Sequence, residues 1–181
     1  NYTRIKRGAP LEEVEPTPDQ INALHIRIVD LGAEPYADFS ILTPHGRRTA
    51  KRLRHRSWMP QEDGSYIAEE VPGPASLDAW EACWGVYEVC LLMLRFPSDD
   101  GSVDQGDEIF SPIALETYLQ HFRRLAKEHP EVWHLCQRAE DRCRAEHFPR
   151  IRRSLSAEKD HSQVITWSAV FTAAALHDRY W

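Results

Sequence analysis

The sequence predicts a mainly α-helical protein, with about five helices in one compact domain and a short extended or hairpin segment between helices 1 and 2. Three observations support this fold class. Apolar residues recur at helical spacing, helix-capping residues precede several of these stretches, and 42% of the 181 residues are hydrophobic, enough for a core. We expect residues 1–15 to form an N-terminal arm and residues 16–181 to form a single helical domain.

The first helix is expected over residues 18–31. Thr17 is a good N-cap, Pro18 suits the first helical position and Gln20 completes a capping box. Apolar residues then follow at helical spacing, and Gly32 is a natural stop.

The next stretch is expected to be partly extended. Residues 35–46 alternate aromatic and aliphatic side chains between prolines. Residues 45–58 fit either a short helix or an extended ribbon, because their periodicity does not decide. Asp63 and Gly64 suit a hairpin turn, and residues 71–76 read as a rigid connector.

The rest of the chain is expected to be helical. The helices cover residues 77–94, 113–129 and 131–151, and a last helix begins near residue 162. Ser76 is the N-cap of the first of them, and Pro97 ends it. Residues 98–108 hold five acids among Ser and Gly, which is typical of a solvated loop.

Tryptophan and cysteine fall at apolar positions of these helices. Each tryptophan is able to bury about 200 Å², so we expect core or subunit contacts from Trp80, Trp84, Trp133 and Trp167. The cysteines are Cys83, Cys90, Cys136 and Cys143. Those on one helix lie about 10 Å apart, too far to bridge each other. Bridges between helices stay open, but small buried residues in a reducing compartment are favoured.

Charge is unevenly distributed. The chain has 28 acidic residues against 22 Lys and Arg, a net charge of −6, which argues against a nucleic-acid coat over the whole surface. The basic residues gather in two runs, Arg47, Arg48, Lys51, Arg52, Arg54 and Arg56, and Arg150, Arg152 and Arg153. Such clusters neutralise phosphates, and Tyr36, Phe39 and Trp58 are aromatics that stack on bases. The alternatives are pairing with acids of the same chain or a neighbouring copy, and simple solubility.

Catalytic and metal-binding patterns are weak. The sequence contains no G-x-S-x-G, H-E-x-x-H, P-loop or G-x-G-x-x-G motif, so we expect neither an enzyme nor a cofactor. Cys136, Cys143 and His147 share a helical face, but zinc pairs are usually closer in sequence, so we expect core packing and no metal. Glu140 and Arg144 are spaced for a surface ion pair worth a few tenths of a kcal/mol. No apolar run approaches the roughly 18 residues that span a bilayer.

Five segments, taken in order, resemble a family of polyproteins. They are "PTPDQINALH", "PYADFSILTPHGRR", "VPGPASLDAWEACWGVYEVCLLML", "HPEVWHLCQRAEDRCRAEHFPRI" and "WSAVFTAAALHDRYW". Together they resemble the Gag-like, capsid-region segment of retroelement-type polyproteins in dinoflagellate protists, from about residue 16 to the end. The resemblance implies a helical assembly domain upstream of a Cys/His-rich knuckle region, with nucleic-acid packaging nearby. No knuckle is present here, and the acidic loop at 98–108 is longer than in the family pattern.

The expected function is therefore that of a structural, capsid-type domain that forms homo-oligomers. We expect it to contact RNA or DNA, or an acidic neighbour, through the two basic runs, inside the cell in the cytoplasm or nucleus and away from membranes. The alternatives are a nucleic-acid-binding module that does not assemble and an accessory subunit of a larger complex. Since the chain starts without Met, we expect it to be a piece of a longer polypeptide.

Overall fold

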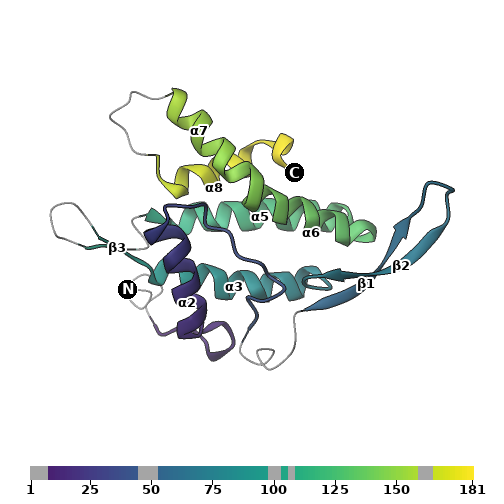
Figure 1. Ribbon diagram of the computed structural model, residues 1–181, viewed down its shortest axis with the longest axis horizontal. Coiled ribbons are helices and arrows are strands. Elements are labelled where there is room, and N and C mark those ends of the chain that lie inside the picture. The colour runs from purple at the N-terminus through teal and green to yellow at the C-terminus, as the bar shows by residue number, and fades with distance from the viewer. Residues whose placement is uncertain (1–7, 45–52, 98–102, 106–108, 159–164) are drawn as a thin grey trace.

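The computed structural model describes residues 8–44, 53–97, 103–105, 109–158 and 165–181 (Figure 1). Its α-helices are α2 (Pro18–His25), α3 (Leu77–Met93), α5 (Pro112–Glu128), α6 (Trp133–Arg142), α7 (Phe148–Glu158) and α8 (Trp167–Leu176). Short helical turns are η1 (Glu12–Val14), η2 (Ile26–Asp30), η4 (Pro130–Val132), η5 (Cys143–His147) and η6 (Asp178–Tyr180). The strands are β1 (Arg54–Pro60), β2 (Tyr66–Pro72), β3 (Arg95–Pro97) and β4 (Val103–Gln105). The π-helical turn η5 joins α6 to α7, so these two form one continuous helix. The prediction of a mainly α-helical domain with about five helices is therefore confirmed over these ranges.

Helix α2 begins as its sequence predicts. The Thr17 hydroxyl accepts a hydrogen bond from the Gln20 N–H at 3.2 Å, and the Gln20 side chain accepts one from the Thr17 N–H at 2.9 Å. The π-helical turn η2 continues the helix, and Gly32 follows it with φ of 60°. Leu24 and Ile28 are buried in the core that α2 forms with α3.

Replacing Thr17 with Ala is expected to lower the free energy of unfolding by about 1 kcal/mol, because the first turn then keeps an unsatisfied N–H. Urea unfolding followed by circular dichroism measures this. Thr17→Ser keeps the hydroxyl and is expected to retain most of the stability. Equal losses in both variants would contradict a capping role.

The segment between α2 and β1 is irregular. Residues 35–44 contain no strand, and a turn forms where the Ile41 N–H bonds to the Asp38 carbonyl oxygen at 3.0 Å. Phe39 and Leu42 are buried. The expected extended run is therefore interrupted, because the apolar side chains turn inward onto the helices instead of pairing with a strand.

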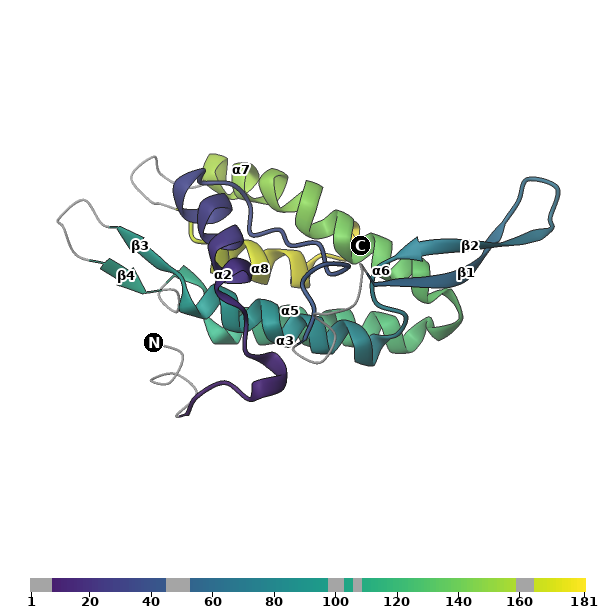
Figure 2. The same ribbon diagram turned by 60° about the horizontal axis from the view of Figure 1, so that its bottom comes forward.

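The predicted hairpin is confirmed. β1 and β2 pair antiparallel, with Arg54 opposite Pro72 and Pro60 opposite Tyr66. Gly64 lies in the connecting turn with φ of 81°, a conformation that favours glycine. Figures 1 and 2 show that the hairpin extends away from the helices, at the far end from β3.

Helix α3 is the centre of the core. Its Ser76 cap accepts from the Ala79 N–H at 3.3 Å, as predicted. Most of its side chains are buried on every side, as expected for an internal helix. Trp80 and Trp84 stack with ring centroids 5.2 Å apart, and Trp84 stacks on Tyr118 of α5 at 5.3 Å. The core assignment is confirmed for Trp80, Trp84 and Trp167, and Trp133 packs half-buried against the same cluster.

Helix boundaries after α3 differ from the prediction. The helix ends at Met93, ahead of Pro97, and β3 then pairs with β4, so part of 98–108 is a strand rather than a loop. The helix expected over 131–151 runs on through Pro149 to Glu158. Proline donates no N–H, and the π-helical turn η5 precedes it, with the Phe148 N–H bonded to the Cys143 carbonyl oxygen. Helix α8 begins later than expected, after an N-cap at Thr166.

The C-terminus returns to the core. Helix α8 packs against α5 and α7, as Figure 2 shows. The Trp181 indole N–H donates to the Ala174 carbonyl oxygen at 2.9 Å, and its ring lies 5.0 Å from that of Tyr118. Over the described ranges, no helix combines the length and apolar character needed to cross a membrane.

Candidate functional site

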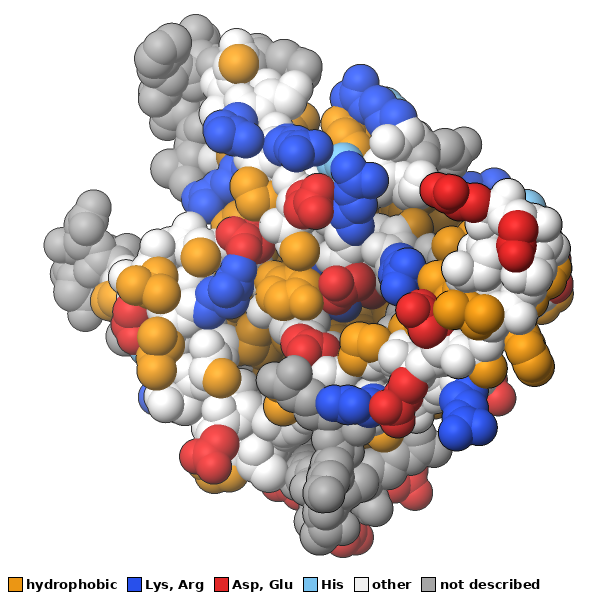
Figure 3. Space-filling view, turned by 45° about the vertical axis from the view of Figure 1, so that its right-hand side comes forward, with side chains coloured by type: hydrophobic (Ala, Val, Ile, Leu, Met, Phe, Trp, Pro, Cys, Tyr) orange, Lys and Arg blue, Asp and Glu red, His pale blue; other side chains and the backbone are white. Residues whose placement is uncertain are grey.

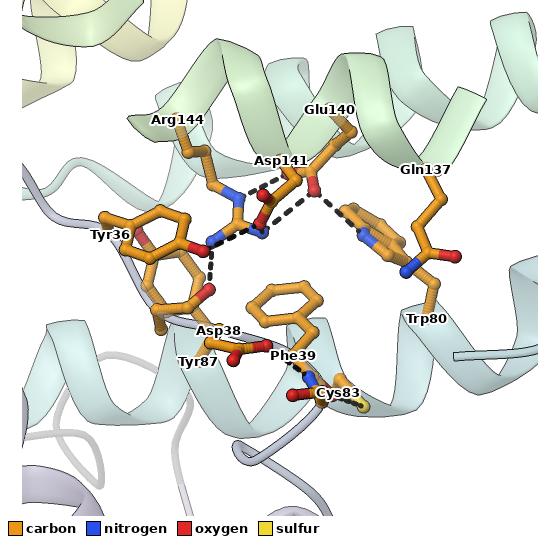
Figure 4. A network of polar contacts seen from close by, with 12 residues as sticks. Tyr36, Asp38, Phe39, Trp80, Cys83, Tyr87, Gln137, Glu140, Asp141 and Arg144 are labelled. Atoms are coloured by element: carbon orange, nitrogen blue, oxygen red, sulfur yellow. Dashed lines mark hydrogen bonds and ion pairs between the residues drawn. The ribbon is translucent and has the colours of Figure 1, made fainter. Parts of the chain in front are cut away.

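A buried guanidinium links α6 to the irregular segment (Figure 4). Arg144, in η5, is 1% exposed, and its Nη1 donates to the Ala37 carbonyl oxygen at 2.6 Å. Its Nε and Nη2 donate to the two Glu140 carboxylate oxygens at 2.5 and 2.9 Å. The guanidinium carbon also lies 4.1 Å from the centre of the Phe39 ring. Arg144 therefore holds residues 37–39 against the helix.

Glu140 is as deeply buried as its partner, at 1% exposure. Its Oε2 accepts from the Trp80 indole N–H at 3.2 Å, and its Oε1 accepts from the Tyr118 hydroxyl at 3.4 Å. The carboxylate thus connects α6 to α3 and α5. Buried charges persist where the remaining hydrogen-bonding positions are filled, and here they are.

The prediction of a surface pair for Glu140 and Arg144 is wrong. The i, i+4 spacing and the favourable order, Glu before Arg, are right. The spacing does not show that another segment of the chain covers the pair. Residues 36–39, more than a hundred positions earlier in the chain, lie over the pair and leave each side chain only 1% exposed.

Further bonds fix the covering segment. The Tyr36 hydroxyl donates to Asp141 Oδ1 at 3.0 Å, and the Tyr87 hydroxyl donates to the Pro35 carbonyl oxygen. The Cys83 thiol donates to the Phe39 carbonyl oxygen at 3.8 Å. An irregular segment with few backbone partners is thereby satisfied by side chains of α3 and α6.

Burial and neighbouring charge shift the titration of these groups. Burial lowers the pKa of Arg144, but the charge and hydrogen bonds of the Glu140 carboxylate more than offset this effect, so the net pKa is above its ordinary value. Burial, with the nearby Asp141 carboxylate, raises the pKa of Tyr36 to about 12, and burial raises that of Tyr87. Arg144 is therefore a permanent cation, and both phenols stay protonated donors at neutral pH.

Asp141 gives a pH-dependent prediction. Burial raises the pKa of its carboxyl, although Arg144 and the Tyr36 hydroxyl lower it in part. A carboxyl with a higher pKa in the folded state stabilises the fold in acid, and this contribution is lost as the pH rises through the folded pKa. Asp141→Asn removes the titration, so its stability relative to the unaltered protein is expected to increase from about pH 4 to about pH 7.

Urea unfolding across that pH range measures the difference. Glu62→Gln, an exposed carboxyl in the hairpin turn, controls for the loss of one negative charge. A difference between Asp141→Asn and the unaltered protein that does not change with pH would contradict the prediction.

A cavity of about 360 Å³ lies beside the cluster. Its wall is formed by residues 36–40, by the root of the hairpin at residues 71–74, and by α6 and η5. The root is held to α6, because the Gln137 Nε2 donates to the Pro72 carbonyl oxygen at 2.9 Å and the Trp133 indole donates to that of Pro74 at 2.9 Å. Gly73 has φ of 115°, a conformation that favours glycine, and an added Cβ there would lie 1.7 Å from the Gln137 Nε2 and displace that side chain.

The hairpin beyond this root exposes large apolar side chains. Trp58 is 67% exposed, Tyr66 64% and Ile67 45%. Residues opposite each other share a face, so Trp58, Ala68, Pro60 and Tyr66 lie together on one side of the hairpin. An isolated two-stranded hairpin is only marginally stable in water, which makes this element a candidate for covering by a partner.

The predicted basic residues are only partly placed. Arg47, Arg48, Lys51 and Arg52 lie outside the described residues. Arg54 and Arg56 lie in β1, so of the two predicted alternatives the extended ribbon is the one that forms at these positions. Arg54 makes an ion pair with Glu70 at 3.1 Å. Both side chains are exposed on the face that carries Trp58.

The second basic run lies on α7. Arg150 and Arg153 are exposed, whereas the Arg152 guanidinium packs 4.4 Å from the Trp167 ring and is half-buried. From Gln137, at the hairpin root, to Arg150 is about 20 Å along the helix. The described members of the two runs are therefore not brought together into one site.

Cysteines and histidines form no metal centre in the part of the chain that the structure describes. Cys83, Cys90 and Cys143 are buried and Cys136 is half-buried, and none of these four is in a disulfide. Burial raises the pKa of the Cys143 thiol to about 12, so it stays protonated.

Comparison with known proteins adds no assignment. The chain matches no protein-family model, no curated protein and no solved structure. Fold and site together define a mainly α-helical domain with a buried polar cluster at the root of an exposed β-hairpin.

Proposed function

We propose that this domain is a structural, Gag-like assembly unit that self-associates through the β1–β2 hairpin. The observation that carries the proposal is the exposure of Trp58 and Tyr66 on one face of a hairpin that extends from the helical body (Figure 1), with Ile67 exposed on its other face. Contiguous exposed apolar side chains mark interaction surfaces, and Trp and Tyr are the residues that most often dominate binding energy.

Charge supports a second copy as the partner. The outer part of the hairpin, residues 57–71, holds four acids, Glu62, Asp63, Glu69 and Glu70, and Glu70 is paired with Arg54 at the start of β1. Helices α6 and α7 carry exposed arginines, Arg138, Arg142, Arg150 and Arg153. Figure 3 shows several Lys and Arg side chains on the upper part of this face, to the side of the hairpin, with Asp and Glu side chains among them. Opposite charges on two faces of one chain favour head-to-tail contact between copies, which builds rings or filaments.

Sedimentation equilibrium from micromolar to millimolar concentration tests the proposal. The average mass is expected to rise with concentration, and to rise less in high salt because the charges are then screened. A protein that stays monomeric over the whole range at low salt would rule it out. The proposal places the domain inside the cell, in the cytoplasm or nucleus, where four cysteines outside disulfides stay reduced.

A second candidate function is contact with RNA or DNA without assembly. It is favoured by Arg54, Arg56 and Trp58, which combine positive charge with a stacking surface on one exposed face of β1. Fluorescence anisotropy with single-stranded RNA and DNA at low salt tests it. Affinity is expected to fall steeply with salt, and an absence of binding at low salt would remove this candidate.

A further inference from the structure

The cavity at the hairpin root is a partly open pocket lined by four separate parts of the chain. Residues 36–40, residues 71–74, α6 with η5, and Trp80 of α3 form its wall. Figure 4 shows Tyr36, Asp38 and Phe39 facing Gln137, Asp141 and Arg144 across it. Its volume of about 360 Å³ falls within the range of small-ligand sites. The self-association proposed above is argued from the exposed part of the hairpin and does not depend on this cavity.

Carboxylates outnumber enclosed cations in this wall. Asp38, Glu140 and Asp141 line the cavity together with Arg144. Arg144 donates hydrogen bonds to both carboxylate oxygens of Glu140 and to the Ala37 carbonyl oxygen. Its Nη2 lies 3.8 Å from the Asp141 Oδ1. Asp38 and Asp141 are therefore incompletely neutralised. Arg138 also lines the cavity, but its side chain is exposed, so water screens its charge.

Two buried acceptors in the same wall lack partners. Ser40 is 2% exposed, and its Oγ makes no hydrogen bond to any described residue. The same holds for the Gln137 Oε1, and the bond from Gln137 Nε2 to the Pro72 carbonyl fixes which end of the amide is left. Buried polar groups are normally satisfied, and the exceptions call for an explanation.

Aromatic rings also line the cavity. Tyr36, Phe39 and Trp80 line the cavity, and ring faces attract cations. A wall rich in carboxylate, amide and hydroxyl oxygens matches a group that carries positive charge and several N–H donors.

We propose that the cavity binds an organic cation of this kind, a guanidinium or a primary ammonium group. Asp141 and Asp38 supply the countercharge, and Gln137 Oε1 and Ser40 Oγ accept its N–H groups. The group belongs either to a small molecule or to an Arg or Lys side chain of a second copy. The recognition chemistry is the same in both cases.

Titration with N-acetyl-argininamide tests the site. Binding is followed by calorimetry and by the NMR signal of the Trp80 indole N–H, which lies in the wall. The expected result is saturable binding with a shift of that signal, and binding at least tenfold weaker for the neutral isostere N-acetyl-citrullinamide. Lack of saturation with both compounds at millimolar concentration overturns the proposal, as does equal affinity for the two.

Variants locate the site. Asp141→Asn is expected to weaken argininamide binding at least tenfold, because the cation loses its countercharge. Ser40→Ala is expected to weaken it by a smaller factor. Glu146→Gln removes a carboxylate from the same helix but outside the wall, where it pairs with Arg142, and is expected to leave binding unchanged. Equal losses in Asp141→Asn and Glu146→Gln would contradict the assignment.

Sedimentation in the presence of argininamide distinguishes the two sources. If a second copy supplies the cation, argininamide and Asp141→Asn both dissociate the oligomer. If a small molecule is the ligand, argininamide binds without changing the oligomer. A monomeric protein that binds argininamide would overturn the proposed self-association and support the cation site, so the two proposals fail separately.

Discussion

Replacing Arg144 with Met is expected to lower the free energy of unfolding by about 3–5 kcal/mol, because Glu140 then remains as an unpaired charge in the core. The Ala37 carbonyl also loses its donor, and the Phe39 ring loses the cation above it. A loss of this size is a large share of the 5–15 kcal/mol typical of a domain. Urea unfolding at low temperature, followed by circular dichroism, measures it.

Two further variants separate the charge from the packing. Glu140→Met combined with Arg144→Met removes both charges and is expected to recover at least half of the loss, since no charge is left buried alone. Arg142→Met, on the same helix, breaks an exposed pair with Glu146 and is expected to change stability by less than about 1 kcal/mol. A loss below about 1 kcal/mol for Arg144→Met would show that water reaches Glu140.

Local sequence predicted the elements that depend on local chemistry. Thr17 with Gln20, Ser76, and Gly64 in the hairpin turn each set a boundary through contacts a few residues away. The π-helical turn before Pro149 also has a local signal, a proline inside a helical pattern, but the predicted helix ends at residue 151 and the observed one continues to Glu158.

The buried cluster could not be predicted in the same way. Glu140 and Arg144 have the same spacing as any exposed helical ion pair, and their burial depends on residues 36–39, which cover them. Likewise, the alternation in β1 and β2 predicts a hairpin but not what covers it. That depends on whether another element packs on Trp58, and in the described chain the side chain is left exposed.

The cluster and the hairpin are mechanically connected. The cluster holds residues 36–39 against α6 and η5. Helix α6 in turn holds the hairpin root through Gln137 and Trp133. The hairpin therefore begins from a base that is hydrogen-bonded to α6, while its far end extends away from the described helices. A base held in this way limits the entropy lost when the exposed end docks on a partner.

Replacing Trp58 and Tyr66 together with Ala is expected to weaken self-association at least thirtyfold, because central aromatic residues each contribute about 2 kcal/mol or more to an interface. Their side chains are exposed in the single chain, so the unfolding midpoint is expected to change little. Sedimentation equilibrium measures the association, and urea unfolding checks the fold.

Ile113→Ala is the matched control, since Ile113 is 78% exposed on α5, away from the hairpin. It removes a comparable exposed apolar side chain and is expected to leave association unchanged. If Ile113→Ala weakens association as much as the Trp58 and Tyr66 replacements do, the contact is non-specific. If the double variant remains folded and associates like the unaltered protein, the hairpin is not the assembly element, because the proposed contact is made by these two rings.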